Sequence, residues 1–363
     1  MLALPFVSFL SLDNRGLGSK KSSHIFLFLI DNLLLRWTRC STISQPLEET
    51  DKKGNAMLIE REAESCYLGQ FIPLQYHHNM LMDANRMDNF KAAIERQVFE
   101  GAKVLELGGG TGVLSWFAAQ KASKVYCVEF NPDMVVEARR LLAKNAHGDR
   151  VEVIHADAFE YLPPEPVDVV ICEMIHVAMI REKQVEVIEN FKQRYTEKFG
   201  GPLPIFIPEA IVMAVQPLHH TYDFWGYQAP IIQFLQPGVF SADTRELAPP
   251  ALYSVIDFTQ PNGLQIQWSG TFTMEKAGTL SALRFVTKNI LAVLMDSSST
   301  IDWLNHYMSL PVPEPFDVKV GDIIEVSFNY RAGGSFASLQ NSLNVSLKST
   351  AASRAAHLSL VHA

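Results

Sequence analysis

The sequence predicts an α/β fold with two domains, a doubly wound Rossmann-like domain followed by a β-rich, barrel-like domain. The chain has 363 residues, which exceeds the usual size of a single domain. Up to about residue 199, short apolar runs alternate with segments of helical periodicity, as in a parallel sheet with crossover helices. Beyond Pro204, short apolar runs follow one another between turn residues, which is typical of antiparallel β-structure.

Four runs are expected to form the parallel strands, at residues 103–107, 124–130, 151–155 and 167–172. They are almost continuously apolar, so both faces of the sheet should be covered by helices. The periodic segments 113–120 and 134–145 supply crossover helices, and residues 180–195 predict a third. The runs 205–207, 211–215, 264–268, 290–294 and 323–328 are assigned to the β-rich domain.

These patterns divide the chain into four regions. Residues 1–56 are expected to be a disordered or adventitious extension, since their apolar run at 25–30 is too short to span a bilayer. A signal or transit peptide is the alternative, although no small-residue cleavage site follows the run. Residues 57–203 form the doubly wound domain, 204–347 the β-rich substrate domain, and 348–363 a fraying tail.

Composition narrows the classes of partner. The formal net charge is -8 and the pI about 5.8, which disfavours a broad surface for nucleic acid, and no membrane association is expected. The four cysteines form no C-x-x-C pair and have no metal-ligand spacing, so no metal site is expected. Cysteines of this kind are typical of buried thiols in a reducing, cytoplasmic compartment.

A glycine-rich turn follows the first expected strand and precedes a helix. Gly108, Gly110 and Gly112 stand in this turn, in the context that a nucleotide-type loop requires. Glycine allows the backbone to come close to a ligand. The glycines alone do not distinguish NAD from S-adenosylmethionine.

Carboxylates at three successive strand ends favour S-adenosylmethionine. Glu106 precedes the first glycine by two positions, where methyltransferases of this class place an acidic residue that can engage the methionine ammonium. Glu129 lies 129 − 110 = 19 residues beyond Gly110, close to the spacing of about 20 for the residue that binds ribose hydroxyls. Asp157 and Ala158 end the third strand, where this class contacts adenine. Singly, such carboxylates are more often helix N-caps or solvated loop residues.

Residues 77–86 resemble the N-terminal motif of protein arginine methyltransferases, H-x-x-M-L-x-D-x-x-R. Residues 104–119 resemble that family's cofactor loop, and residues 167–173 its fourth strand. The resemblance implies that Arg86 binds the carboxylate of the cofactor's methionine, a role that suits the planar fork of arginine. The alternative for Arg86 is a surface ion pair with Asp83 or Asp88 on the same helix.

The same family holds the substrate guanidinium with two glutamates nine residues apart. Glu173 and Glu182 have this spacing, 182 − 173 = 9, so the resemblance implies that they are the catalytic pair. Paired carboxylates offset the repulsion between a sulfonium and a guanidinium and orient the reacting nitrogen. The alternative for Glu182 is a solvated position on the helix expected at 180–195.

The sequence departs from the family's pattern at several places. The stretch between the glutamates lacks the usual Trp-Met-Gly and aromatic residues, and the Thr-His-Trp loop is reduced to Ile301-Asp-Trp303. His176 and Trp303 are the candidate acceptor contacts, although an aromatic residue in a β-domain is more often part of the core. Residues 215–250 do not clearly match the family's two-helix dimerisation arm, and a homodimer remains possible.

The resemblance implies an S-adenosylmethionine-dependent N-methyltransferase. Its expected acceptor is a guanidinium in a protein, a peptide or a small guanidino compound. Two alternatives remain open: a methyltransferase of the same scaffold that modifies another amine or a metabolite, and a cofactor-binding pseudoenzyme.

Overall fold

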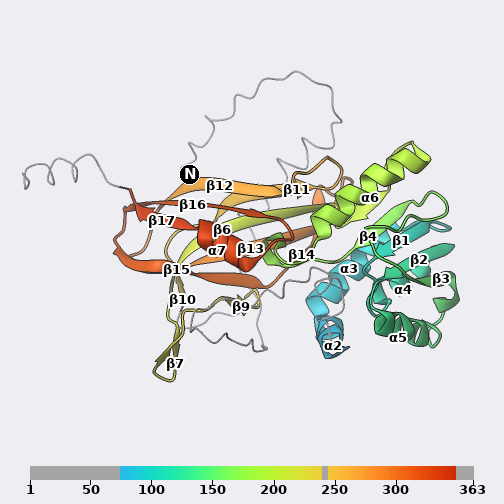
Figure 1. Ribbon diagram of the computed structural model, residues 1–363, viewed down its shortest axis with the longest axis horizontal. Coiled ribbons are helices and arrows are strands. Elements are labelled where there is room, and N and C mark those ends of the chain that lie inside the picture. Colours follow the sequence, from blue (N-terminus) through green and yellow to red (C-terminus); the bar gives the residue numbers. More distant parts are fainter. Residues whose placement is uncertain (1–73, 239–243, 349–363) are drawn as a thin grey trace, which may run out of the picture. The chain divides into compact units, whose positions relative to one another are not determined.

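The computed structural model describes residues 74–238 and 244–348 (Figure 1). The expected N-terminal extension lies outside the described residues, as do all but the first residue of the expected tail. Cys40 and Cys66 also lie outside them. Cys127 and Cys172 are free and buried, as predicted.

The first sheet contains five parallel strands in the order β3-β2-β1-β4-β5. Between the strands run α4 (Val113–Ala119), α5 (Pro132–Leu142), the 3-10 helices η2 (Gly148–Arg150) and η3 (Val177–Met179), and α6 (Gln184–Phe199). The predicted doubly wound architecture is confirmed. Chain order reverses between β1 and β4, so their carboxyl ends form the crevice where open α/β sheets bind ligands. The strands are β1 (Lys103–Leu107), β2 (Lys124–Glu129), β3 (Val151–His155), β4 (Val169–Cys172) and β5 (Ile205–Ile207).

Local sequence explains how the crossover helices begin. Asn131 ends the loop after β2 and caps α5, since its side chain accepts a hydrogen bond from the Asp133 amide at 3.0 Å. Pro132 is the first residue of α5, where its fixed φ suits a helix and its missing N–H costs nothing. The loop after β2 is therefore short and its direction is fixed.

Two sequence-based assignments were wrong. Residues 205–207, assigned to the β-rich domain, form β5 and pair in parallel with β4, with Ile205 opposite Val169. A three-residue apolar run carries no signal of strand direction, and here the crossover through α6 determines it. The helix expected from residue 180 begins only at Gln184, because Arg181 has a positive φ of 70° that no helix accommodates.

The second half is antiparallel and β-rich, as predicted. Strands β10-β6-β13-β15-β9 form one path, with β11 added to β6 and β14 to β13, while β12, β16 and β17 form a second sheet. The bounds are β6 (Ala210–His220), β9 (Gln233–Leu235), β10 (Thr244–Glu246), β11 (Ala251–Asp257), β12 (Gln265–Thr273), β13 (Gly278–Leu294), β14 (Ser299–Leu304), β15 (Tyr307–Val318), β16 (Ile323–Arg331) and β17 (Asn344–Leu347). The short hairpin β7 (Asp223–Phe224) and β8 (Tyr227–Gln228) and the helix α7 (Phe336–Ser342) complete it.

An aromatic cluster joins the two antiparallel sheets. The ring centroid of Tyr253 on β11 lies 5.8 Å from that of Phe285 on β13 and 5.2 Å from that of Phe328 on β16. All three side chains are buried. Such edge-to-face aromatic contacts add to the stabilisation from the large apolar area that each ring removes from water.

Helix α3 (Ala84–Gln97) links the β-rich half to the parallel sheet, and α2 (Leu74–Met82) precedes it. Asp83 caps α3 by accepting a hydrogen bond from the Arg86 amide at 3.0 Å. Phe90 and Ile94 bury the inner face of α3, which contacts both α4 and β14. No helix of residues 74–238 and 244–348 combines the length and the apolar character that a bilayer crossing requires.

Candidate functional site

The glycine turn after β1 has a backbone that other residues could not adopt without strain. Gly108, Gly110 and Gly112 have φ values of 80°, 52° and 78°, in the left-handed region that glycine occupies freely. A Cβ at Gly110 would lie 3.0 Å from the ring carbon Cε1 of His77. The turn is therefore closely packed against the side chains of His77 and Met174.

Glu129 connects the end of β2 to this turn. Its carboxylate accepts hydrogen bonds from the Gly110 amide at 2.7 Å and from the Asn131 amide at 2.8 Å. The side chain is buried. The carboxylate thus stands beside the glycine turn, at the position where ribose hydroxyls are expected.

Glu106 is buried and bound to the start of α4. One of its carboxylate oxygens accepts hydrogen bonds from both the amide and the hydroxyl of Ser115 on α4, the amide at 2.9 Å. Burial raises the pKa of Glu106 to about 8. The side chain stabilises the first turn of α4, and its predicted contact with the methionine ammonium stays a prediction.

Asp157 and Ala158 follow β3 at the same edge of the sheet. The Asp157 carboxylate accepts a hydrogen bond from the Phe159 amide at 2.8 Å. Both residues are partly exposed. They are available to a ligand lying along the carboxyl ends of β1, β2 and β3.

Arg86 forms a partly buried ion pair with Glu173. Its guanidinium donates to the Glu173 carboxylate, and their side chains are 7% and 11% exposed. This geometry excludes the surface ion pair with Asp83 or Asp88 as the main role of Arg86. Although burial alone lowers it, the Glu173 carboxylate raises the net pKa of Arg86. The buried Nε of Arg86 has no hydrogen-bond partner among the described residues.

Glu182 lies close enough to Glu173 for their charges to interact. Burial, followed by repulsion from Glu173, raises the pKa of Glu182 to about 8, while Arg181 and Arg86 act in the opposite direction. Glu182 precedes α6 and is partly buried, so the alternative of a solvated helix residue is wrong. The two glutamates therefore share one electrostatic environment.

The β-rich half holds the loop between these glutamates. Thr287 on β13 accepts a hydrogen bond from the Ala178 amide at 2.7 Å, and Tyr330 on β16 donates to the Ala178 carbonyl at 2.8 Å. The amides of Gly333 and Arg181 make further bonds, to the Met179 carbonyl at 2.7 Å and to the Gly334 carbonyl at 2.8 Å.

The two candidate acceptor contacts occupy different surroundings. His176 packs edge-on against Phe234 and Phe336, with ring centroids 5.5 and 5.2 Å away, and burial lowers its pKa to about 4. Trp303 is 5% exposed, and the Arg86 guanidinium carbon lies 5.9 Å from its ring centroid. Trp303 therefore stands beside the Arg86–Glu173 pair, and it packs within the buried core against Phe90, with ring centroids 5.9 Å apart.

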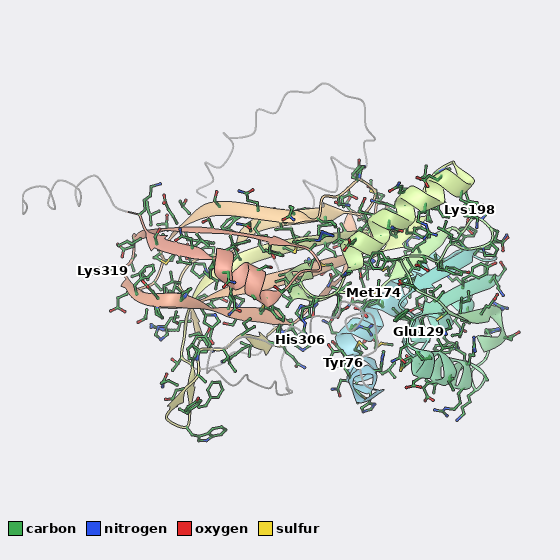
Figure 2. All side chains as sticks on the ribbon, viewed as in Figure 1. Tyr76, Glu129, Met174, Lys198, His306 and Lys319 are labelled. Carbon is green, nitrogen blue, oxygen red and sulfur yellow. The ribbon has the colours of Figure 1, made fainter. Side chains whose placement is uncertain are left out.

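Sequence reasoning missed two residues near the glutamates. His77 begins the H-x-x-M-L-x-D-x-x-R motif, so its packing against Gly110 could have been anticipated from the motif alone. Tyr76 had no such signal: although 45% of its surface is exposed, desolvation of its hydroxyl and the charges of Glu182 and Glu173 raise its pKa to about 12. Figure 2 labels Tyr76 together with Met174, whose side chain lies against Gly108.

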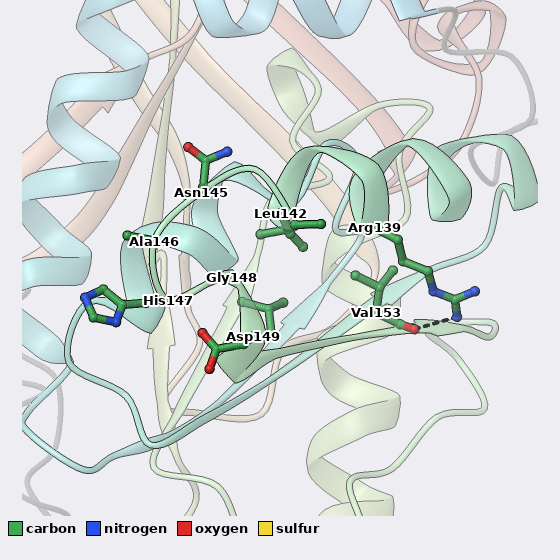
Figure 3. A pocket seen from close by; sticks show the side chains of 10 residues that line it. Arg139, Leu142, Asn145, Ala146, His147, Gly148, Asp149 and Val153 are labelled. Carbon is green, nitrogen blue, oxygen red and sulfur yellow. Dashed lines mark hydrogen bonds between the residues drawn. The ribbon is translucent and has the colours of Figure 1, made fainter.

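One surface depression lies elsewhere. It has a volume of about 490 Å³ (Figure 3) and adjoins the end of α5 and the start of β3. None of the candidate site residues lines it, although the side chain of Leu142 in its lining packs against Gly112. Its lining consists of Arg139, Leu142, Ala143, Asn145, Ala146, His147, Gly148, Asp149, Val151 and Val153.

The residues at the carboxyl edge fit S-adenosylmethionine. A Cβ at Gly109 would lie 2.3 Å from the Cys127 sulfur, so the turn exists only with glycine there. The unpartnered Nε of Arg86 is a buried donor of the kind that a ligand carboxylate satisfies. Glu129 offers an acceptor beside the same turn.

Comparisons with known proteins find a methyltransferase domain in this chain. A family profile described as "Methyltransferase domain" matches residues 104–197. An uncharacterized protein of Methanocaldococcus jannaschii is 28% identical over 74% of this chain and 96% of its own length. A probable histone-arginine methyltransferase of Arabidopsis thaliana is 30% identical over 55% of this chain, which corresponds to 42% of that protein.

Solved structures show the same fold. The Trypanosoma brucei PRMT1 enzyme-prozyme complex with AdoHcy matches with a TM-score of 0.62 at 17% identity, covering 78% of this chain and 96% of that one. Arabidopsis thaliana protein arginine methyltransferase 10 matches with a TM-score of 0.61 at 19% identity, covering 73% and 89%. The chain is therefore an S-adenosylmethionine-dependent methyltransferase that is similar to protein arginine methyltransferases in sequence and in fold.

Proposed function

We propose that this enzyme transfers a methyl group to a guanidinium nitrogen that Glu173 and Glu182 hold between them. The observation that carries the proposal is the placement of both carboxylates beside Arg86, at the crevice next to the glycine turn. Two acidic groups in one partly buried site are costly unless a cation joins them. A guanidinium presents a planar array of donors that pairs with two carboxylates.

The proposed chemistry is mainly charge compensation and orientation. Bound S-adenosylmethionine supplies a methyl group on a cationic sulfonium. Glu173 and Glu182 would offset the repulsion between that charge and a cationic acceptor, and aim one nitrogen at the methyl carbon. With a pKa near 8, Glu182 is suited to accept the proton that the methylated nitrogen releases.

The cofactor roles are proposed residue by residue. Arg86 would bind the methionine carboxylate through its free Nε edge, and Glu129 the ribose hydroxyls. Gly108, Gly110 and Gly112 would form the backbone cradle, with Asp157 and Ala158 along the adenine and Glu106 supporting the turn from α4. His176 and Trp303 are proposed to wall the acceptor side, and a homodimer stays a prediction.

S-adenosylhomocysteine is expected to bind with micromolar or better affinity, whereas NAD is not expected to bind. A carboxylate at the end of β2 suits the adenosine ribose of either ligand, whereas Arg86 would pair with the methionine carboxylate, a group that NAD lacks. Calorimetric titration of the full chain with each ligand measures both affinities. Tight binding of NAD would contradict the cofactor assignment.

The kcat/KM for a guanidinium acceptor is expected to rise with pH, with an inflection near pH 8. Glu182, facing Glu173, Arg86, Arg181 and Tyr76, has a pKa raised to about 8, so below that pH it is largely protonated and lacks the charge that holds a cation. Arginine stays cationic throughout this range, so the inflection belongs to the free enzyme. Initial rates across the pH range test this, and a flat profile would contradict the role of the Glu182 carboxylate.

Methyl transfer to matched peptides tests the proposed acceptor. One peptide contains a single arginine, and the control peptide has lysine at that position. We expect mass spectrometry to show methylation of the arginine peptide only. Methylation of the lysine peptide, or of neither peptide when a small amine is modified, would favour the second candidate, another amine on the same scaffold. The absence of aromatic residues between the glutamates, where His176 packs against Phe234 and Phe336 instead, keeps that candidate open.

A further inference from the structure

The loop between Glu173 and Glu182 has an unfavourable backbone conformation. Ala178, Met179 and Arg181 have φ values of 57°, 55° and 70°, in the left-handed region that residues with a Cβ rarely adopt. Ala178 and Met179 are also completely buried. Such a backbone persists only where the surrounding structure over-determines it, so the loop requires an external support.

Two hydroxyl groups of the β-rich half provide that support. The Thr287 hydroxyl accepts from the Ala178 amide at 2.7 Å, and the Tyr330 hydroxyl donates to the Ala178 carbonyl at 2.8 Å. Both polar groups of one strained peptide residue are therefore bound by side chains from different strands. Thr287 and Tyr330 are themselves buried, so water cannot replace either hydroxyl without rearrangement.

Ala178 is placed where its conformation affects both glutamates. It lies five residues after Glu173 and four before Glu182 (178 − 173 = 5 and 182 − 178 = 4). The support continues beyond it, because Gly333 approaches the chain after Glu182: a Cβ there would lie 3.5 Å from the Glu182 carbonyl oxygen. A change of φ at Ala178 would redirect the chain on both sides.

We propose that Thr287 and Tyr330 are positioning residues for methyl transfer. They hold Ala178 in its left-handed conformation and thereby set the distance and orientation between the Glu173 and Glu182 carboxylates. This inference rests on the proposed function of the two glutamates. Without either hydroxyl, a buried polar group of Ala178 loses its partner, and the loop relaxes out of the strained conformation. A misplacement of about 1 Å at a reacting centre can cost about a hundredfold in rate.

The test compares variants that differ only in the hydroxyl. Thr287→Val keeps the shape and removes the hydroxyl, whereas Thr287→Ser keeps the hydroxyl. We expect Thr287→Val to lower kcat by at least about tenfold, with the S-adenosylhomocysteine affinity changed by less than about twofold, because the cofactor residues lie on other elements. Thr287→Ser is expected to restore most of the rate. Tyr330→Phe is the independent second variant, with the same expected pattern.

Ser281→Ala is the matched control. Ser281 lies on β13 like Thr287, is buried, and its hydroxyl binds the main chain of His220 at 2.7 and 2.8 Å. Removal of the Ser281 hydroxyl loses comparable hydrogen bonds and leaves the contacts of the loop between Glu173 and Glu182 unchanged. We expect kcat close to the wild-type value in this variant. An equal loss in Ser281→Ala and Thr287→Val would overturn the proposal.

Hydrogen–deuterium exchange of residues 174–182 tests the positioning role independently of the proposed guanidinium acceptor. Faster exchange in Thr287→Val and Tyr330→Phe, but not in Ser281→Ala, supports the anchoring, and rates are then measured on whichever acceptor the enzyme uses. A wild-type enzyme that methylates no guanidinium, together with this exchange pattern, would reject the proposed acceptor alone. Unchanged exchange in both variants, or wild-type kcat in Thr287→Val, would overturn the positioning role.

Discussion

Glu173→Gln and Glu182→Gln are each expected to lower methyl transfer to a guanidinium at least about a hundredfold, comparable to losing one preorganised electrostatic group at a reacting centre. Glutamine keeps the size of the side chain and removes its charge, so the repulsion between the sulfonium and the acceptor is no longer offset. In Glu182→Gln, the affinity for the cofactor should change much less than the rate, because Glu182 is not one of the residues proposed to bind the cofactor. Steady-state rates and calorimetric titration of each variant measure the two effects.

Glu197→Gln supplies the control for this pair, because Glu197 is an exposed glutamate on α6. We expect it to keep the wild-type rate. Full activity of Glu182→Gln would reject the guanidinium mechanism while leaving the methyltransferase assignment intact, because a neutral amine needs no second carboxylate. Loss of rate with Glu197→Gln as well would point to a general effect on folding.

Arg86→Ala is expected to weaken S-adenosylhomocysteine binding by roughly 2–5 kcal/mol, the usual cost of removing one partner of a desolvated charge pair. In affinity this is about 30-fold to several thousand-fold. The variant also leaves Glu173 in a largely buried position without its counter-charge, so methyl transfer should fall even at saturating cofactor. Calorimetry gives the affinity, and rates at saturating cofactor give the second effect.

Arg96→Ala is the matched control on the same helix. Arg96 is exposed and pairs at 2.5 Å with Asp296, which is exposed as well, and exposed pairs contribute little. Its affinity for S-adenosylhomocysteine should equal that of the wild type. An unchanged affinity in Arg86→Ala would show that Arg86 serves only the ion pair with Glu173 and not the cofactor.

Much of the parallel sheet could be predicted because its signals are local. Each of β1 to β4 is an apolar run, and Glu106, Glu129 and Asp157 each lie at or next to a strand end. Since the carboxyl ends of parallel strands share one edge, the sequence alone was enough to group these residues. The family resemblance added Arg86, whose pairing with Glu173 spans 87 residues of sequence and has no local signal.

The support of the glutamate loop could not be predicted in the same way. Thr287 and Tyr330 are ordinary strand residues, and their contact with Ala178 depends on the register of β13 with β6 and of β16 with β12. The left-handed backbone at Ala178 and Met179 is equally invisible in the sequence, because no glycine or asparagine marks it. The periodicity of residues 180–195 instead suggested a helix, which explains why Glu182 first resembled a solvated helix residue.

The chemical identity of the methylated group tests the proposed guanidinium mechanism most directly. The full-length enzyme is incubated with isotopically labelled S-adenosylmethionine and a cell lysate, and the labelled products are hydrolysed in acid and separated. We expect label in methylated arginine, at a level that falls at least about a hundredfold in Glu182→Gln, as expected for the loss of a preorganised charge. Label in methylated lysine, in another amino acid or only in a small metabolite would contradict that mechanism.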